Sequence, residues 1–368
     1  MATVELVNVA HSYDGSKTYA VKDINLSWQD GVASALLGPS GCGKTTLLKI
    51  ISGLLKPSEG KVLIDGQDVT AQSPRERNVA QVFQFPVVYE TLNVYNNLAF
   101  PLRNRGVDKA EVDRSVRAVA EMLELTPYLK KRANRLGAAE KQRISMGRGI
   151  VRSDTTAVLF DEPLTIIDPQ QKWHLRRKLK ELHQRLNLTM IYVTHDQHEA
   201  LTFADQVTVM DAGEALQTAS PEELHHQPAA PFVGYFIGSP GMNLFDGKAL
   251  DGGIQLADTH LPLAPDLAEG NSVQVGNSVQ VGIRPEYVQV SRDAHEGWFP
   301  ATITRTMLTG NALMLELTGE NLQLKAIVPE ESPLQAGETI YVHFPHDKVL
   351  LYSSRQDGGK RLETQVAA

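Results

Sequence analysis

A glycine-rich stretch near residue 40 has the residue types that bind phosphate groups. It follows the apolar run 32–37 and leads into a segment with helical periodicity from Leu47, so a buried strand is expected to turn into a helix there. The stretch fits the pattern G-x-x-x-x-G-K-[ST] and consists of Gly38, Pro39, Ser40, Gly41, Cys42, Gly43, Lys44, Thr45 and Thr46. Its backbone N–H groups and the following helix N-terminus favour anions, which predicts a loop that binds a nucleotide triphosphate.

Two side chains of this loop have predicted roles in the chemistry. Lys44 would reach the β- and γ-phosphates of ATP, and the Thr45 hydroxyl would complete part of the Mg²⁺ shell. Cys42 is the single cysteine of the chain, so no internal disulfide forms, and we interpret it as a small filler residue and not a nucleophile. A glycine-rich turn that matches by chance is the alternative, and the acidic residues downstream argue against it.

Two adjacent acids follow the apolar strand pattern 157–160. Asp161 would hold Mg²⁺, usually through water, and Glu162 would polarise the attacking water as general base. Ligands of open α/β sheets bind at the carboxyl ends of the strands, where these acids lie. A solvated turn is the alternative interpretation of the pair.

Three further polar residues are expected at the same sheet edge. His195 follows the strand pattern 189–193 and would contact the γ-phosphate and orient both the water and Glu162. Gln84 ends a short strand pattern and would contact Mg²⁺ and the water. Its loop would report occupancy of the site to a neighbouring segment. Asp168 would reach across a subunit interface or, alternatively, cap the helix that starts at Pro169.

An aromatic residue before the phosphate loop could bind the base of the nucleotide. Tyr13 is the candidate for the adenine platform, because stacking on a purine contributes about 1–3 kcal/mol and tolerates any base. A half-buried loop tyrosine without that role is the alternative, and Tyr19 is the substitute candidate.

The composition is that of an ordinary soluble protein with more than one core. The chain has 368 residues, 42% hydrophobic and 21% charged, with a net charge of −7 and a pI near 5.9. The acidic balance argues against a nucleic-acid partner. No apolar run reaches the roughly 18 residues of a membrane span, and no basic-then-apolar signal pattern begins the chain, so we expect a cytoplasmic protein.

The pattern along the chain changes near residue 240. Strand patterns alternate with amphipathic helices up to that point, which predicts a parallel sheet, with a helical subdomain at about 85–155. Short strands and Gly/Pro turns then predict an all-β domain at 241–355, followed by a flexible tail at 356–368. The segment 271–276 repeats directly as 277–282, which we interpret as a local duplication that lengthens a loop or strand.

The chain resembles the ATP-binding subunits of ABC transporters, most closely the carbohydrate-importer branch with the maltose and glycerol-phosphate type ATPases. The resemblance covers the whole chain. Four matching stretches are shared by ABC ATPases generally, and they are 38–46, 82–84, 158–163 and 191–197. Two more point to the branch and its oligonucleotide-binding-fold (OB-fold) regulatory domain, and they are 236–243 and 281–286.

This resemblance implies an α/β fold, a P-loop NTPase ABC domain with a RecA-like core and helical subdomain, followed by an all-β OB-fold-like regulatory domain. It also implies ATP and Mg²⁺ as cofactors and a place on the cytoplasmic face of the inner membrane. The implied partners are two transmembrane permease subunits and, through them, a periplasmic solute-binding protein. Two ATPase subunits would close head to tail on two ATP molecules, each site using the signature helix of the other subunit.

The signature departs from the family pattern L-S-G-G-Q. The aligned residues are Leu136, Gly137, Ala138, Ala139 and Glu140. Gly137 has no hydroxyl to donate to the γ-phosphate, the two alanines place methyl groups where backbone must approach phosphate, and Glu140 adds negative charge. Positions 165–168 read T-I-I-D where the family usually has S-N/A-L-D.

Intact catalytic residues beside an altered signature predict an asymmetric heterodimer with a second, different ABC ATPase subunit. A signature that works adequately as it stands is the alternative. The expected function is ATP hydrolysis that powers import of a sugar, polyol or glycerol-like solute, and polyamine and inorganic-anion importers also resemble the chain. A nucleotide-gated regulatory or non-transport protein with little hydrolysis is the rival function.

An apolar run directly follows Gln84 and spans residues 85–89. It would receive a helix of a membrane subunit, and ATP-driven closure would pass movement to that helix. Packing of the run inside the helical subdomain is the alternative.

Overall fold

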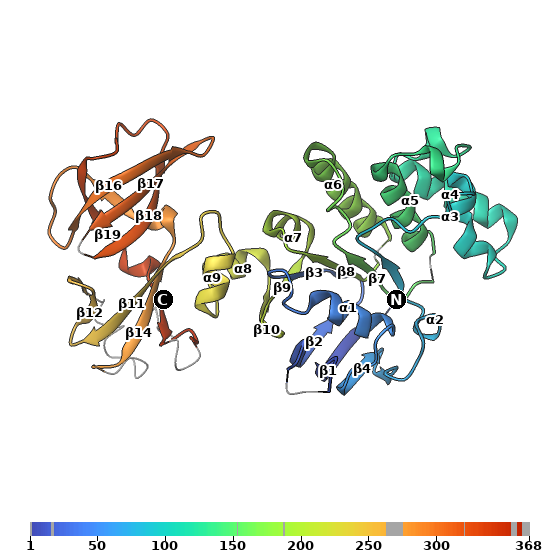
Figure 1. The fold of residues 1–368 in the computed structure, drawn as a ribbon, viewed down its shortest axis with the longest axis horizontal. Helices are drawn as coiled ribbons and strands as arrows, with labels where there is room; N and C mark the ends of the chain where they lie inside the picture. Colours follow the sequence, from blue (N-terminus) through green and yellow to red (C-terminus); the bar gives the residue numbers. More distant parts are fainter. Residues whose placement is uncertain are drawn as a thin grey trace. The chain divides into compact units, whose positions relative to one another are not determined.

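The computed structural model describes residues 2–15, 18–152, 154–186, 188–262, 275–319, 321–354 and 359–362. The chain divides into two compact units, Met1–Pro221 and Glu222–Ala368, which are described separately (Figure 1). Residues 271–274 of the expected duplication lie outside the described residues.

The first unit is built on a six-stranded sheet with a mostly parallel order. Its order is β10-β9-β3-β8-β7-β6, and all neighbours pair in parallel except the edge strand β10. The strands are β3 (Ala33–Leu37), β6 (Ala80–Val82), β7 (Val158–Asp161), β8 (Met190–Thr194), β9 (Gln206–Asp211) and β10 (Glu214–Ala219). β3, β7 and β8 are buried along their whole length, as expected for strands covered on both faces.

Helix α1 (Lys44–Ser52) lies between this sheet and a smaller antiparallel sheet (Figure 1). The smaller sheet has the order β2-β1-β4-β5, formed by β1 (Val4–His11), β2 (Val21–Trp28), β4 (Glu59–Ile64) and β5 (Gln67–Asp68). Leu47, Ile50 and Ile51 of α1 are fully buried in one core with residues of both sheets. This packing fixes the start of α1, and with it the loop that precedes the helix.

Between β6 and β7 the chain forms a helical subdomain. Its helices are α3 (Val94–Arg103), α4 (Lys109–Met122) and α5 (Ala138–Ile150), which group together in Figure 1. One face of α4 is buried, with Val112, Val116, Val119 and Leu123 at helical spacing, as expected for an amphipathic helix. The other helices of the first unit are α2 (Pro74–Arg77), α6 (Pro169–Leu186) and α7 (Gln197–Phe203).

The second unit is mainly two five-stranded antiparallel sheets. One has the order β13-β12-β11-β14-β20 and the other the order β15-β19-β16-β17-β18. The strands are β11 (Asn243–Leu250), β12 (Gly253–Leu256), β13 (Thr259–Pro262), β14 (Ser278–Ile283), β15 (Gln289–Ser291), β16 (Phe299–Leu308), β17 (Ala312–Gly319), β18 (Leu322–Pro329), β19 (Thr339–His343) and β20 (Leu350–Ser353). Side chains from both sheets share one apolar core, so the predicted all-β domain is present.

The division of the chain into two units falls after Pro221, and the boundary expected from the sequence is after residue 240. The segment between them contains α8 (Pro221–His226) and α9 (Pro231–Phe236), and α9 packs on β11 and β14. The expected flexible tail at 356–368 is described only in part. Of its described part, residues 359–362, the Arg361 N–H donates to the Ala229 carbonyl and the Leu362 N–H donates to the Leu351 carbonyl, so this part is held in place.

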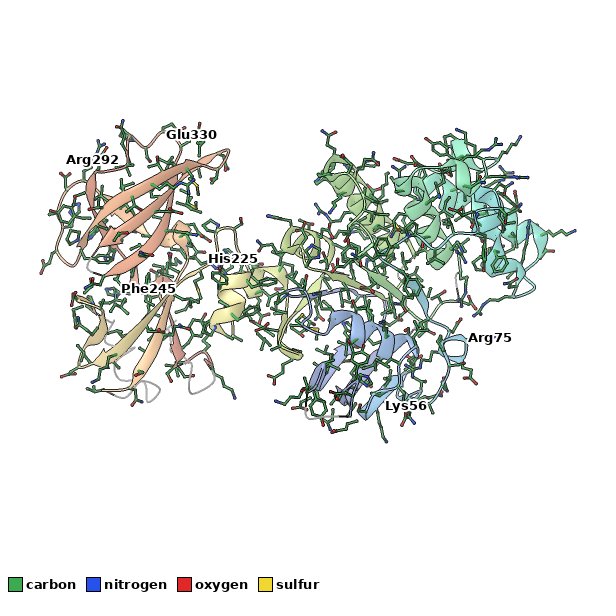
Figure 2. All side chains as sticks on the ribbon, viewed as in Figure 1. Lys56, Arg75, His225, Phe245, Arg292 and Glu330 are labelled. Carbon is green, nitrogen blue, oxygen red and sulfur yellow. The ribbon has the colours of Figure 1, made fainter. Side chains whose placement is uncertain are left out.

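Arg284 joins the two short helices to the β-sheets of the second unit. It is buried, and its Nε donates to the His225 carbonyl at 2.8 Å while Nη1 donates to the Ile237 carbonyl at 2.6 Å. Figure 2 labels His225 and, on the exposed surface, Arg292, which pairs with Glu338 at 2.9 Å.

Removal of this buried guanidinium should destabilise the second unit. Arg284→Ala leaves two carbonyls unpaired, so we expect the free energy of local unfolding to fall by about 3 kcal/mol. Hydrogen exchange of the β14 amides measures this fall. The control Arg292→Ala removes an exposed ion pair and should cost less than about 1 kcal/mol. If the two variants lower the free energy of local unfolding equally, Arg284 does not hold helices α8 and α9 in place.

Candidate functional site

The glycine-rich stretch forms the loop between β3 and α1. Gly43 is the N-cap of α1 with φ 102°, and a Cβ there would lie 2.5 Å from the Ala20 carbonyl oxygen. A Cβ on Gly38 would lie 2.2 Å from the Met210 carbonyl oxygen. Both positions therefore require glycine, and the loop presents backbone N–H groups at the N-terminus of a nine-residue helix.

Lys44 points back into this loop. Its Nζ donates to the carbonyl oxygens of Gly38 at 2.8 Å and Pro39 at 2.9 Å, and the side chain is buried. The ammonium is therefore held at the centre of the loop, where an anion bound by the backbone N–H groups would meet it.

Cys42 is buried beside Lys44, with 3.7 Å between Sγ and Nζ. Burial raises the pKa of its thiol more strongly than the Lys44 ammonium lowers it. The thiol is therefore a packing group in this loop. Three further residues of the loop, Ser40, Gly41 and Thr45, are exposed.

The Glu162 side chain lies close to two other residues expected in the site, His195 and Gln84. Its Oε2 lies 3.1 Å from His195 Nδ1 and 3.5 Å from Gln84 Nε2, and it accepts a hydrogen bond from Thr165 Oγ1 at 3.2 Å. The backbone of Glu162 has φ 45°, a left-handed conformation that costs of order 1–3 kcal/mol in a residue with a side chain. Its N–H donates to the Val193 carbonyl at 3.0 Å, which anchors this conformation between β7 and β8.

Asp161 faces the phosphate loop from the end of β7. Its Oδ1 accepts a hydrogen bond from Thr45 Oγ1 at 3.2 Å. Burial raises the pKa of Asp161, with Glu162 adding to the rise and Thr45 opposing it. A carboxylate and a hydroxyl oxygen are thus brought together, and burial of the carboxylate favours a cationic partner over water.

The oxygen donors at Thr45 and Asp161 fit Mg²⁺. Among the described residues no group of three or more His, Cys, Asp or Glu side chains forms a complete metal cage. Mg²⁺ in nucleotide sites is typically held by one or two protein oxygens together with phosphates and water, which is the donor set present here. The structure brings Gln84 to Glu162, and its described contacts do not include Thr45 or Asp161.

Tyr13 lies against the phosphate loop. Its hydroxyl shares a 3.0 Å hydrogen bond with Thr46 Oγ1, and its ring meets the His11 ring edge-on at a centroid distance of 4.7 Å. The side chain is 63% exposed, so a face of the ring is open to a stacking partner. Tyr19 instead donates its hydroxyl to Glu59 at 2.8 Å.

Asp168 precedes α6 and caps it. Its Oδ1 accepts a hydrogen bond from the Gln170 N–H at 3.0 Å, and its carbonyl accepts one from the Lys172 N–H at 2.9 Å. Asp168 is exposed, so the capping role does not prevent a contact with a second subunit.

The altered signature lies at the N-terminus of α5. Gly137 is the N-cap and makes no side-chain cap hydrogen bond, while Ala138, Ala139 and Glu140 form the first turn. Glu140 Oε2 lies 2.8 Å from the position that a Cβ on Gly137 would occupy. The Glu140 carboxylate therefore lies beside Gly137 at the start of α5, and its negative charge disfavours an anion at this helix N-terminus.

Thr165 is a residue of this site that sequence reasoning did not assign. Its position three residues after Glu162 in an altered loop was the available signal, but a hydroxyl contact to the carboxylate depends on the turn that follows β7.

Comparisons with known proteins show the family of the chain. A family model described as "ABC transporter" matches residues 21–165, one described as "MalK OB fold domain" matches 238–288, and one described as "TOBE domain" matches 281–351. The chain is 38% identical over 365 residues to the sn-glycerol-3-phosphate import ATP-binding protein UgpC of Pectobacterium atrosepticum, covering 99% of this chain and 100% of the relative. It is also 38% identical to UgpC of Escherichia coli K12, with 96% and 98% covered.

Two solved structures resemble the first unit. One is cbiO1 from Clostridium perfringens, part of an ABC transporter complex, with a TM-score of 0.56, 26% identity, and 60% of this chain and 89% of that chain covered. The other is a dimeric ATP-binding cassette bound to ADP and Pi after hydrolysis, with a TM-score of 0.53, 28% identity, and 59% and 98% covered. In the part of our chain that the structure describes, no helix has the length and apolar character of a membrane span. The chain belongs to the ATP-binding subunits of carbohydrate-type ABC importers, and it is an ATPase of that family.

Proposed function

We propose that this ATPase powers import of a glycerol-like, polyol or sugar solute as one half of an asymmetric ATPase heterodimer. The observation that carries the proposal is the contrast between an assembled Glu162 cluster and a signature helix with Gly137 at its N-cap and the Glu140 carboxylate in its first turn. The glycerol-phosphate solute named for the relatives supports this solute class. Their names also favour transport over the rival regulatory function.

In the proposed mechanism, Glu162 accepts a proton from the water that attacks the γ-phosphate. His195 Nδ1 and Thr165 Oγ1 both contact Oε2, which fixes the carboxylate and leaves its other oxygen, Oε1, free to face the water. His195 is half exposed and can also reach the phosphate, while Gln84 links this point to the loop before the apolar run 85–89.

Binding of ATP would use the loop and its neighbours. Lys44 would exchange the carbonyls of Gly38 and Pro39 for β- and γ-phosphate oxygens, and Tyr13 would stack on adenine. Mg²⁺, when bound, would neutralise charge on the phosphates, and Thr45 and Asp161 would hold it, with Gln84 as a further candidate.

The asymmetry follows from which chain supplies which part of each site. The loop, acids and histidine of this chain would face the intact signature of a sister ATPase, which makes one competent site. The sister's ATP would face Gly137, Ala138, Ala139 and Glu140 in a slow site, with Asp168 near the shared interface. In a dimer of two identical copies, both sites would face the altered signature.

Two permease subunits and a periplasmic solute-binding protein complete the proposed importer, with this chain at the cytoplasmic face of the inner membrane. The run 85–89 supports a docking role, because Phe85 is 68%, Val87 49% and Tyr89 40% exposed. Exposed apolar side chains next to Gln84 are placed to receive a helix of a permease.

Comparing ATP hydrolysis by the chain alone and with its sister ATPase tests the proposal. We expect about 100-fold slower turnover by the chain alone, because its sites lack the signature donors. The sister is obtained by co-purification with the membrane complex and identified by mass spectrometry. Fast turnover by the chain alone, or a complex containing two copies of it and no other ATPase, would rule out the heterodimer.

A further inference from the structure

Glu199 is a buried acidic residue of α7 that the proposed mechanism does not use. It is 4% exposed and lies in the first turn of the helix. Its Oε2 accepts hydrogen bonds from the Tyr192 hydroxyl at 2.9 Å and from Thr194 Oγ1 at 3.0 Å, and its Oε1 lies 3.5 Å from Lys172 Nζ. A buried carboxylate is costly unless it is paired and hydrogen-bonded, and two donors from β8 and one cation from α6 meet that requirement here.

Glu199 is hydrogen-bonded to the residue on each side of His195. Thr194 precedes His195, and its hydroxyl donates to Glu199 and accepts a hydrogen bond from the Asp196 N–H at 3.0 Å. Asp196 follows His195 and is the N-cap of α7, where its Oδ1 accepts a hydrogen bond from the Glu199 N–H at 3.3 Å. The backbone that carries His195 is therefore held by Glu199, while the His195 ring lies 3.1 Å from Glu162.

The contact with Lys172 connects this loop to a distant part of the site. Lys172 lies near the start of α6, and its N–H donates to the Asp168 carbonyl at 2.9 Å. α6 begins directly after the altered positions 165–168 and packs against α7 (Figure 1). One ion pair thus joins the segment expected at the subunit interface to the loop of His195.

The three contacts of Glu199 differ in how easily they can change. Tyr192 and Thr194 belong to β8, a fully buried strand inside the six-stranded sheet. Burial and the Glu199 carboxylate raise the pKa of the Tyr192 phenol well above its ordinary value, so this hydroxyl stays a donor. The Lys172 side chain is 27% exposed, and its ion pair is the longest of the three contacts. A small movement of α6 would therefore change the Lys172 contact first.

We propose that Glu199 and Lys172 are positioning residues for ATP hydrolysis, which hold His195 in place and make its position depend on the start of α6. The inference rests on the proposed role of His195 and adds the residues that place it. The described contacts of the two side chains do not include Lys44 or Glu162, so the pair acts through His195 and not on the nucleotide. Loss of the pair slows the chemical step and leaves ATP binding unchanged, because a small displacement of a catalytic group costs rate steeply.

Charge-removing variants test the pair in the ATPase complex that is isolated from the host with the tagged full-length chain. Glu199→Gln keeps an oxygen that can accept from Tyr192 and Thr194 but removes the charge that attracts Lys172. Glu199→Gln and Lys172→Gln should each lower kcat for phosphate release about tenfold, with KM and ATP affinity unchanged. The double variant should be no slower than the slower single variant, since both changes remove the same interaction. Losses that multiply in the double variant would overturn the link.

A second ion pair of α6 supplies the matched control. Lys178→Gln with Glu181→Gln removes a 3.1 Å pair on the same helix outside this link and should leave kcat unchanged. Lys172→Arg keeps the charge and should retain most of the wild-type turnover. Thermal unfolding is the folding check, and the partly exposed Lys172 gives a variant that folds even if Glu199→Gln does not. Wild-type kcat in Lys172→Gln, with or without a lower melting temperature, would assign the pair to stability alone and overturn the inference.

His195→Ala separates this inference from the proposed role of His195. Adding Lys172→Gln to His195→Ala should slow hydrolysis no further, because the pair acts through this histidine. A further tenfold loss would show that the pair acts elsewhere and would overturn the inference. Wild-type hydrolysis by His195→Ala would contradict the proposed role of His195, and the inference would fall with it. Slow hydrolysis by His195→Ala beside wild-type hydrolysis by Lys172→Gln and Glu199→Gln would overturn the inference alone.

Discussion

Glu162→Gln is expected to lower ATP hydrolysis by the assembled importer by at least about 100-fold, because a general base contributes about 10²–10⁴-fold and an amide cannot accept the proton. The substitution keeps the shape of the side chain. The amide oxygen of the glutamine can take the place of Oε2 and accept the hydrogen bond from Thr165, so ATP affinity should be unchanged. Hydrolysis is measured as phosphate release, and affinity by equilibrium titration with ATP.

A matched control distinguishes loss of the general base from loss of one contact that positions it. Thr165→Val removes one contact to Oε2 and keeps the carboxylate, so hydrolysis should fall by less than about tenfold. Retention of half or more of the wild-type hydrolysis by Glu162→Gln would show that another group activates the water. Loss of ATP affinity in the same variant would assign Glu162 to binding.

Most of this site could be predicted because parallel strands bring their carboxyl ends to one edge. β3, β7 and β8 are neighbours in the sheet, so the residues after them meet even though they lie far apart in the sequence. The patterns 32–37, 157–160 and 189–193 were sufficient to predict these strands, and Lys44, Glu162 and His195 follow directly from them. The predicted roles of these residues remain to be tested.

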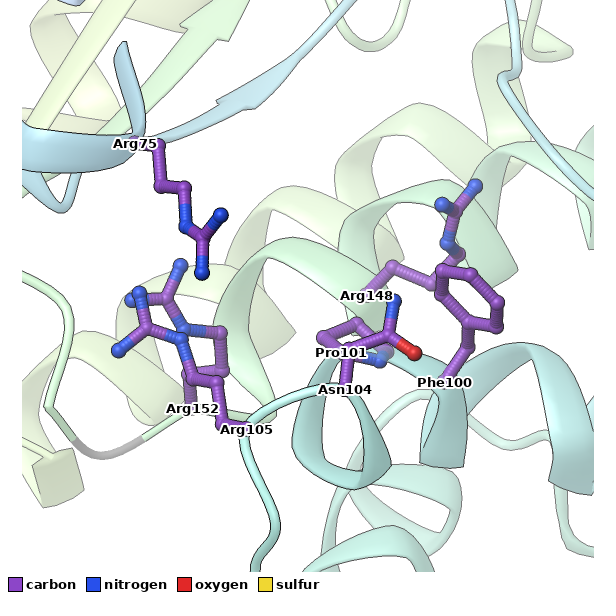
Figure 3. Close-up of a pocket in the computed structure, with 7 residues that line it drawn as sticks. All are labelled: Arg75, Phe100, Pro101, Asn104, Arg105, Arg148 and Arg152. Atoms are coloured by element: carbon purple, nitrogen blue, oxygen red, sulfur yellow. The ribbon is translucent and has the colours of Figure 1, made fainter. Parts of the chain in front are cut away.

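The contacts that sequence reasoning missed depend on side-chain rotamers and on distant packing. The Glu140 carboxylate lies beside Gly137 because of its side-chain rotamer on the first turn of α5. Hydrophobic periodicity in the sequence does not predict such a rotamer. Arg75 and Arg152 line the same cavity of the first unit because three helix ends meet there, and no spacing in the sequence links them (Figure 3). Sequence patterns likewise do not indicate that Arg284, which follows β14, hydrogen-bonds the carbonyls of His225 and Ile237 in the segment before the sheets.

The position of Glu140 in the structure adds to the reasons why the altered signature should bind phosphate poorly. A missing hydroxyl at Gly137 weakens binding of a phosphate, and the Glu140 carboxylate in the first turn adds negative charge where an anion would otherwise be favoured. A serine at residue 137 would place its Cβ 2.8 Å from Glu140 Oε2, so Gly137→Ser alone requires the carboxylate to move. The carboxylate is the end of a flexible side chain and can move, but its negative charge would remain, so the repair changes both positions.

Repair of the signature should accelerate ATP hydrolysis by the purified chain in the absence of any other ATPase subunit. The variant carries Gly137→Ser, Ala138→Gly, Ala139→Gly and Glu140→Gln, which restores the hydroxyl, allows close backbone approach and removes the negative charge. One oxyanion-type donor contributes about 10²–10³-fold, so we expect an increase of at least about 100-fold in phosphate release. Gly137→Ser alone should give a much smaller increase, because the two alanines and the negative charge of Glu140 remain.

The repaired chain with Glu162→Gln added is the control for this prediction. It should bind ATP and form the closed dimer without hydrolysing it, since the repaired signature acts only through a site that has its general base. Size-exclusion chromatography with ATP measures the dimer, and phosphate release measures turnover. If the repaired chain hydrolyses ATP no faster than wild type although it dimerises with ATP, the signature is not what limits this chain, and the argument for a second, different ATPase subunit loses its basis.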